Sequence, residues 1–289
     1  MNNNPAARPT VGRIDRIAWR TATVDDGAVS YGAVGRGRPV VFVHGWGFTS
    51  RAYRPAIERL AESGVRVYAP TLPGFAGTTD LPRGHRSLAG YASWLGRFLD
   101  AAGIDEPVTL VGHSFGGGVA IQAAHDLPDR VRTLVLVNSI GGGTWSSDGD
   151  AVGDIAERPL WDWGMAGLAE AFSSRPHPAA IVGLARDAAA NAVSNLCALW
   201  QSAHLARTAD LRRELRALAD RDLPVVVLWG RGDVVIPQAS LRTLRDALRN
   251  PLTLTVDGNH GWLVVDPGAF GVAMGAALAA AAARQQAAA

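Results

Sequence analysis

The stretch Leu110-Val111-Gly112-His113-Ser114-Phe115-Gly116-Gly117-Gly118 sets one serine between glycines at the end of an apolar run. A serine at a sharp strand-to-helix turn takes up a strained backbone conformation, and its hydroxyl then projects from the turn. Only very small residues two positions before and after the serine allow so tight a bend, and Gly112 and Gly116 occupy those positions. The stretch therefore predicts that Ser114 is a nucleophile.

The residues on either side of this turn fit a buried strand followed by a helix. Residues 107–111 are rich in β-branched side chains, as in a buried parallel strand. Residues 119–124 favour a helix, and Leu127-Pro128 marks its end. The alternative is a glycine-rich turn with an incidental serine, and the presence of catalytic partners elsewhere in the chain decides against it.

Two later stretches offer the partners that a catalytic serine needs, a base to take its proton and a third group to orient that base. Asp233 follows the apolar run at residues 225–230, and His260 follows the run at residues 252–256. The carboxyl ends of parallel strands meet at one edge of a sheet, so both loops would lie beside Ser114. The order Ser, Asp, His along the chain also fits this serine motif. We predict a catalytic triad of Ser114, Asp233 and His260.

Other acids compete with Asp233 for the third place. Asp257 lies just before the histidine and is more typical of a turn. Asp266 directly precedes a proline, which is typical of a helix N-cap. Three further acids precede the strand at residues 225–230 rather than follow it, and this would place them away from the serine: Asp210, Asp220 and Asp222.

The attacked carbonyl oxygen gains negative charge, which backbone N–H groups can stabilise. The first donor we predict is the amide of Phe115, at the start of a helix whose dipole adds positive potential. The second is the amide of Trp46, in the stretch His44-Gly45-Trp46-Gly47 after an apolar run at residues 39–43. We expect His44 to be a structural hydrogen-bonding residue under this loop. His113 is also expected to be structural, because strand alternation points it away from the nucleophile.

Taken together these stretches resemble the α/β-hydrolase superfamily, in the form of a serine-triad hydrolase with a helical cap. The resemblance implies a mostly parallel eight-stranded sheet with helices on both faces, and a helical cap inserted after the sixth strand. It is specific for the fold and for the triad but not for the substrate. Five stretches carry it: His44-Gly45-Trp46-Gly47, Pro70-Thr71-Leu72-Pro73-Gly74-Phe75-Ala76-Gly77-Thr78, Gly112-His113-Ser114-Phe115-Gly116, Gly230-Arg231-Gly232-Asp233 and Gly258-Asn259-His260-Gly261.

The chain divides accordingly. Residues 1–17 are polar and are expected to be disordered. Residues 18–140 and 219–289 would form the α/β core, with early strands near residues 18–24, 28–34, 65–69 and 131–137. Residues 141–218 open with glycines and serines and then become rich in Ala and Leu at helical spacing, so we expect them to form the cap.

Composition narrows the class of function. The 289 residues suit one α/β domain with an insertion, and all 28 basic residues are arginine, for a net charge of +2. No basic run interleaved with aromatics indicates a nucleic-acid surface. The single cysteine and the spacing of the histidines predict neither a disulfide nor a metal site. We expect a cytoplasmic enzyme without cofactor or metal, with no membrane partner, acting as a monomer or homodimer on a small molecule.

The predicted activity is hydrolysis of an ester-like bond through an acyl-enzyme. An apolar or aromatic substrate is expected from five tryptophans assigned to the pocket: Trp145, Trp161, Trp163, Trp200 and Trp262. A carbon–carbon bond hydrolase, a thioesterase or a cofactor-free haloperoxidase or perhydrolase would use the same triad. A non-catalytic ligand-binding receptor on the same fold is the alternative from another class.

Overall fold

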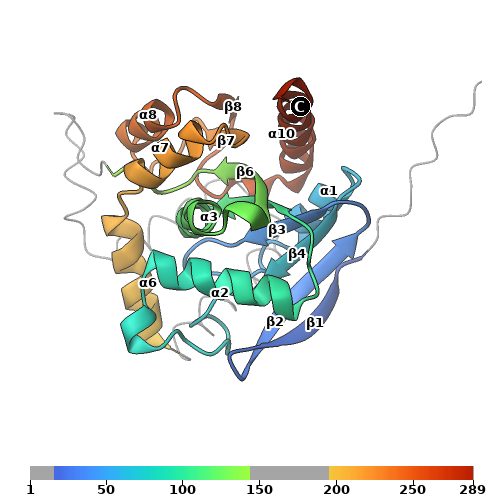
Figure 1. Cartoon of the computed structure of the whole chain (residues 1–289), viewed down its shortest axis with the longest axis vertical. Coiled ribbons are helices and arrows are strands. Elements are labelled where there is room, and N and C mark those ends of the chain that lie inside the picture. Colours follow the sequence, from blue (N-terminus) through green and yellow to red (C-terminus); the bar gives the residue numbers. More distant parts are fainter. Residues whose placement is uncertain (1–15, 144–194, 289) are drawn as a thin grey trace, which may run out of the picture.

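The computed structural model describes residues 16–143 and 195–288. Its centre is one eight-stranded sheet in the order β1-β2-β4-β3-β5-β6-β7-β8 (Figure 1). β1 pairs with β2 and β2 with β4 in antiparallel fashion, and every other neighbouring pair is parallel. This confirms the predicted mostly parallel sheet. The strands are β1 Ala18–Val24, β2 Gly27–Gly35, β3 Pro39–Val43, β4 Arg66–Pro70, β5 Val108–His113, β6 Val131–Val137, β7 Val225–Gly230 and β8 Leu252–Val256.

Helices cover both faces of the sheet, as predicted (Figure 1). One apolar cluster holds the buried residues of α2 Leu88–Ala101, α3 Phe115–Asp126, α7 Arg212–Asp220 and α8 Gln238–Ala247. The other holds those of α1 Arg54–Ala61, α9 Trp262–Val265 and α10 Pro267–Ala288. The described elements are completed by α6 Leu196–Thr208 and by the short helices η1 Arg83–His85 and η2 Pro128–Arg130.

Burial of the central strands on both faces explains their continuous apolar sequences. In β3, Val41 and Val43 enter one apolar cluster, whereas Val40 and Phe42 enter the other, and all four are fully buried. Successive side chains of a strand point to opposite faces, so a strand covered on both sides needs apolar residues at every position. The same alternation holds in β6 and β7.

The described part of the predicted cap segment consists of α6, α7 and the residues that join them. α7 packs against α3 and α8, with Leu215 and Leu218 fully buried in the cluster that these helices share. Residues 144–194 lie outside the described part of the chain, and with them lie Trp145, Trp161 and Trp163.

The last helix is apolar along most of its length. Within the described residues, α10 alone is long and apolar enough to cross a membrane by length and composition. Phe270, Met274 and Ala277 on this helix are nevertheless fully buried in the cluster that it shares with α1. A core helix of a soluble protein passes the same test, so we draw no membrane assignment from α10.

Candidate active site

Ser114 lies between β5 and α3 in a strained turn. Its backbone angles are φ 53° and ψ −119°, outside the regions that L-residues normally occupy. A Cβ atom on Gly112 would lie 2.5 Å from the carbonyl oxygen of Gly116, and one on Gly116 would lie 2.3 Å from that of Val43. Both contacts are with backbone that cannot move aside easily. The two glycines that the sequence pattern required are therefore sterically necessary at this turn.

His260 and Asp233 are brought together by the loops that follow β8 and β7. Nδ1 of His260 lies 3.0 Å from Oδ2 of Asp233. Asp233 is 7% exposed, and burial alone would raise its pKa. Attraction by His260 and the hydrogen bonds that the carboxylate accepts outweigh burial and hold the pKa of Asp233 below its usual value. The Asp233 carboxylate is therefore ionised. Nδ1 of His260 carries a hydrogen and donates it to Oδ2 of Asp233.

Both oxygens of the Asp233 carboxylate have partners. Oδ1 accepts the backbone N–H groups of Val235 and Ile236 at 2.9 and 3.0 Å. Oδ2 accepts from His260 and from Nδ2 of Asn138, the latter at 2.5 Å. With four donors around it, the carboxylate has one orientation, and so has the imidazole that it holds.

Asn138 is a site residue that sequence reasoning missed. It is fully buried directly after β6, with φ 41°. While its Nδ2 holds Asp233, its Oδ1 accepts Nε1–H of Trp262 at 2.8 Å and the backbone N–H of Gly230 at 3.2 Å. Its position in the sequence could have indicated this role, because Asn138 is a polar residue directly after an apolar strand, at the same edge of the sheet as the predicted triad.

The loop after β3 lies against Ser114. A Cβ atom on Gly45 would be 3.3 Å from Cβ of Ser114. The backbone N–H of Trp46, the next residue, has no hydrogen-bond acceptor among the described residues, whereas its indole Nε1–H donates to the carbonyl of Leu199 on α6 at 2.8 Å. Phe115 is the first residue of α3, where an amide has no acceptor within the helix. Both predicted oxyanion donors thus belong to segments next to the serine.

The two histidines beside these loops are buried and neutral. Burial lowers the pKa of His44 to about 4, against a smaller opposing effect of its bond to Gly45. Nε2 of His44 accepts the backbone N–H of Leu72, so Nδ1 carries the proton and donates to the carbonyl of Gly45. Burial, and next the nearby His260, lower the pKa of His113 to about 3. His44 thus has the structural hydrogen-bonding role that was expected of it.

His113 links the serine turn to the base. Its Nε2 lies 3.0 Å from the backbone carbonyl oxygen of His260, and the centroids of the two rings are 5.0 Å apart. Nδ1 lies 2.9 Å from the hydroxyl of Tyr53, which also accepts the N–H of Gly45 at 3.2 Å. Tyr53 was not identified from the sequence, because a tyrosine before a helix carries no pattern that indicates such a contact.

The predicted pocket tryptophans require one correction. Within the described residues Trp262 is a core residue rather than part of an open pocket wall: it is 3% exposed, packs against Phe270 and donates its indole N–H to Asn138. As the first residue of α9 it places its indole between Phe270 of α10 and Asn138 directly after β6. Trp200 is 57% exposed on α6, and its place in a pocket stays a prediction. Trp145, Trp161 and Trp163 lie outside the described residues.

The competing acids have other partners. Asp257 is exposed and pairs with Arg231. Asp266 accepts the N–H of Ala269 at 2.9 Å at the start of α10, as expected of an N-cap. Asp210 pairs with the neighbouring Arg212. Among the described residues, no group of three or more His, Cys, Asp and Glu side chains is placed to hold a metal ion.

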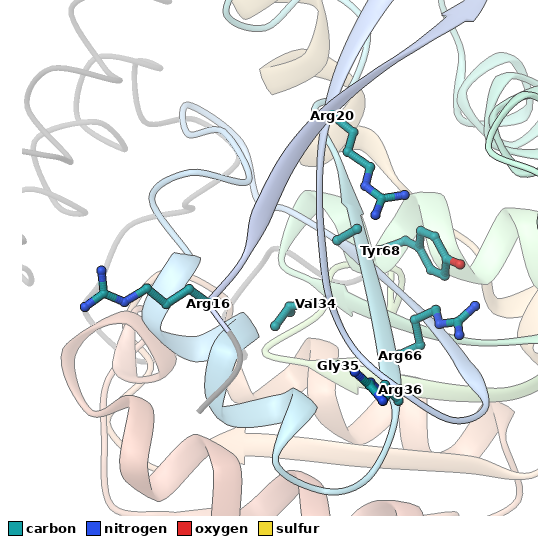
Figure 2. A pocket seen from close by; sticks show the side chains of 8 residues that line it. Arg16, Arg20, Val34, Gly35, Arg36, Arg66 and Tyr68 are labelled. Atoms are coloured by element: carbon teal, nitrogen blue, oxygen red, sulfur yellow. The ribbon is translucent and has the colours of Figure 1, made fainter. Parts of the chain in front are cut away.

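A hollow of about 590 Å³ lies at the other end of the sheet, where β4 begins. Figure 2 shows Arg20, Tyr68 and Arg66 on one side of the strands, with Arg16 extending away from them. Within the described residues, none of the arginines that line this hollow forms an ion pair. None of the predicted catalytic residues lines it.

Comparison with known proteins identifies the family of this chain. The model of the alpha/beta hydrolase family matches residues 40–283. A provisionally named non-heme haloperoxidase of Mycobacterium phage D29 is 29% identical over 86% of this chain and 90% of its own. The pimeloyl-[acyl-carrier protein] methyl ester esterase of Shewanella oneidensis is 27% identical over 71% of this chain and 77% of its own. In fold, a bromoperoxidase from Bacillus anthracis has a TM-score of 0.73 at 20% identity, covering 90% of this chain and 99% of its own.

Proposed function

This chain belongs to the alpha/beta hydrolase family, and from that premise we propose that it is a serine hydrolase that cleaves an ester-like bond through a covalent acyl-enzyme. Its substrate would be a small molecule with an apolar or aromatic group. The catalytic residues are Ser114, His260 and Asp233, and the oxyanion donors are the amides of Trp46 and Phe115.

In the acylation step, Oγ of Ser114 attacks the carbonyl carbon while Nε2 of His260 takes the hydroxyl proton. Asp233 stabilises the imidazolium through Nδ1–H, and the Trp46 and Phe115 amides hold the oxyanion. The tetrahedral intermediate collapses, and the leaving alkoxide receives the proton from His260. Water then attacks the acyl-enzyme by the same route and releases the acid and the free serine.

One observation carries this proposal: a buried carboxylate with four donors holds Nδ1 of His260 and so orients the imidazole that would act as the base. Burying an ionised group is costly unless it is fully hydrogen-bonded. A structural residue in this place would not need to be charged. The arrangement is the one that a general base beside a serine requires.

The apolar character of the substrate is supported by side chains near the proposed catalytic residues. Trp46 in the oxyanion loop and Phe48 two residues further on are both half-buried. Val234, directly after the proposed acid, is 64% exposed. An ester bond is further supported by the relative named as a methyl ester esterase.

The reaction class is tested by labelling with a fluorophosphonate probe, which phosphonylates an activated serine. The wild-type protein should label, and Ser114→Ala should abolish labelling. Ser63→Ala, at an exposed serine after α1, serves as the matched control and should label like wild type. A protein that does not label at all would be a binding protein on a hydrolase fold, and the proposal would fail.

The bond that is cleaved is tested with a panel of p-nitrophenyl esters of increasing acyl length, aryl thioesters and a dienone acid. Turnover of the esters, rising with acyl length, is expected. Turnover confined to the thioesters or to the dienone acid would replace the ester assignment by thioesterase or carbon–carbon bond hydrolysis.

Perhydrolysis is a second candidate, favoured by the haloperoxidase name of the phage relative. The same acyl-enzyme would then be attacked by hydrogen peroxide instead of water and would release a peracid. Peracid formation from an ester and peroxide at a rate above that of hydrolysis would establish it, and a rate far below would exclude it as the main activity.

A further inference from the structure

A buried chain of hydrogen bonds runs from the oxyanion loop to the loop of the base. It consists of Gly45, Tyr53, His113 and the carbonyl of His260, joined by bonds of 3.2, 2.9 and 3.0 Å. Tyr53 and His113 are each less than 5% exposed. The described mechanism gives neither side chain a chemical step, so their role is open.

The donor and the acceptor in each hydrogen bond of this chain can be assigned. The His260 carbonyl can only accept, so Nε2 of His113 must carry a hydrogen. In the neutral ring Nδ1 is then an acceptor, and the Tyr53 hydroxyl donates a hydrogen bond to it. The Tyr53 oxygen in turn accepts the N–H of Gly45. Burial keeps His113 neutral by lowering its pKa, and the bond to the His260 carbonyl fixes its tautomer.

The peptide of Gly45 is held from both sides by this arrangement. Its N–H is used by Tyr53 and its carbonyl accepts Nδ1–H of His44. The next N–H along the loop, that of Trp46, has no acceptor among the described residues and is the oxyanion donor proposed above. A Cβ atom at position 45 would come within 2.9 Å of both Nδ1 of His113 and the Tyr53 hydroxyl, so the Tyr53–His113 hydrogen bond lies directly against this glycine.

We propose that Tyr53 and His113 are positioning residues, which set the distance between the base loop at His260 and the oxyanion loop at Gly45. This inference rests on the proposed function of the same site. Ser114 reacts fast only when the base and the oxyanion donors are correctly placed at the same moment, and small displacements of such groups cost large factors in rate. The hydrogen bonds connect both loops to β5 through His113, the residue directly before Ser114.

The test is Tyr53→Phe, which removes one oxygen and leaves the ring packed. The second-order rate of fluorophosphonate labelling should fall about tenfold, because the variant breaks both bonds of the Tyr53 oxygen, to His113 and to Gly45, and so loosens the oxyanion loop. With a turned-over ester, kcat should fall while KM stays within twofold. Tyr91→Phe is the matched control: it also removes a buried hydroxyl, one that donates to the Pro73 carbonyl, and should leave the labelling rate unchanged.

A second measurement keeps the two proposals apart. Nitrogen-15 NMR of the imidazoles should show His113 with its proton on Nε2 in wild type and in Ser114→Ala, whatever the activity. Labelling of wild type with an unchanged rate in Tyr53→Phe, or a proton on Nδ1, would overturn the positioning role and leave the triad standing. Absence of labelling in wild type would overturn the proposed function and the positioning role with it.

Discussion

The two ends of the parallel strands hold their polar side chains in opposite ways. At the carboxyl ends, His44, His113, Asn138 and Asp233 are all buried and hydrogen-bonded to named partners. At the amino end of β4, Arg66 and the other arginines of the hollow are exposed, and none has an ion pair among the described residues.

This difference shows where the geometry of the molecule is specified. A buried polar group destabilises the fold unless its partners are in place, so each one at the carboxyl edge fixes its neighbours. An exposed guanidinium keeps its hydration and constrains nothing around it. The hollow is the more open feature, but the buried network is where a precise chemical arrangement can be maintained.

The largest effect is expected from Asn138→Asp, which alters the buried network at one atom. It replaces the Nδ2 donor, 2.5 Å from Asp233, by a carboxylate oxygen, and it keeps Oδ1 for Gly230 and Trp262. Two adjacent carboxylates cannot both be ionised, so the free energy of unfolding at pH 8 should fall by about 3 kcal/mol. We expect kcat to fall about 100-fold. Urea unfolding and ester turnover measure the two effects.

The pH dependence of this variant gives it a distinct signature. The pair of carboxyls has a pKa raised above the unfolded value, so the stability of the variant is retained at low pH and lost as pH rises through that pKa. Its deficit relative to wild type should therefore shrink between pH 8 and pH 5.5. Asn250→Asp makes the same change at an exposed residue, also at positive φ, and should cost little. An equal deficit at both pH values would show that charge is not the cause.

An intermediate effect is expected from acidification of the wild-type protein. The pKa values of His44 and His113 are lowered to about 4 and about 3, so between those values and 6.5 the unfolded state binds more protons than the folded state. Stability is therefore full above pH 6.5 and is lost as pH falls. Between pH 7.5 and pH 5.5 the two buried rings should together lower the free energy of unfolding by about 2–3 kcal/mol.

Urea unfolding at a series of pH values measures this loss, and NMR should show both imidazoles neutral down to pH 5. His204→Asn, at an exposed histidine on α6, should leave the slope unchanged. Equal stability at pH 7.5 and 5.5, or titration of either buried ring near pH 6.5, would contradict the contrast between the buried and the exposed edge.

Much of the fold follows from local pattern, because strands covered on both faces must be apolar throughout. The runs at residues 39–43 and 225–230 coincide with β3 and β7, which are buried at every position. The network around the predicted acid did not follow in the same way. Asn138 meets partners about a hundred residues further along the chain, and the direction of the Trp262 side chain depends on where α9 begins. Such contacts are set by tertiary packing, which no local pattern encodes.

The smallest effect is expected from Arg66→Ala at the other edge. The side chain is exposed and has no carboxylate partner among the described residues, so its removal leaves no buried group unsatisfied. The free energy of unfolding should change by less than about 0.5 kcal/mol, and the fluorophosphonate labelling rate should stay within twofold of wild type. The effect of Arg20→Ala should simply add to that of Arg66→Ala, since two exposed, hydrated cations interact weakly at physiological salt. A large loss of reactivity in either variant would mean that the two edges are coupled through the sheet, and the contrast drawn between them would have to be abandoned.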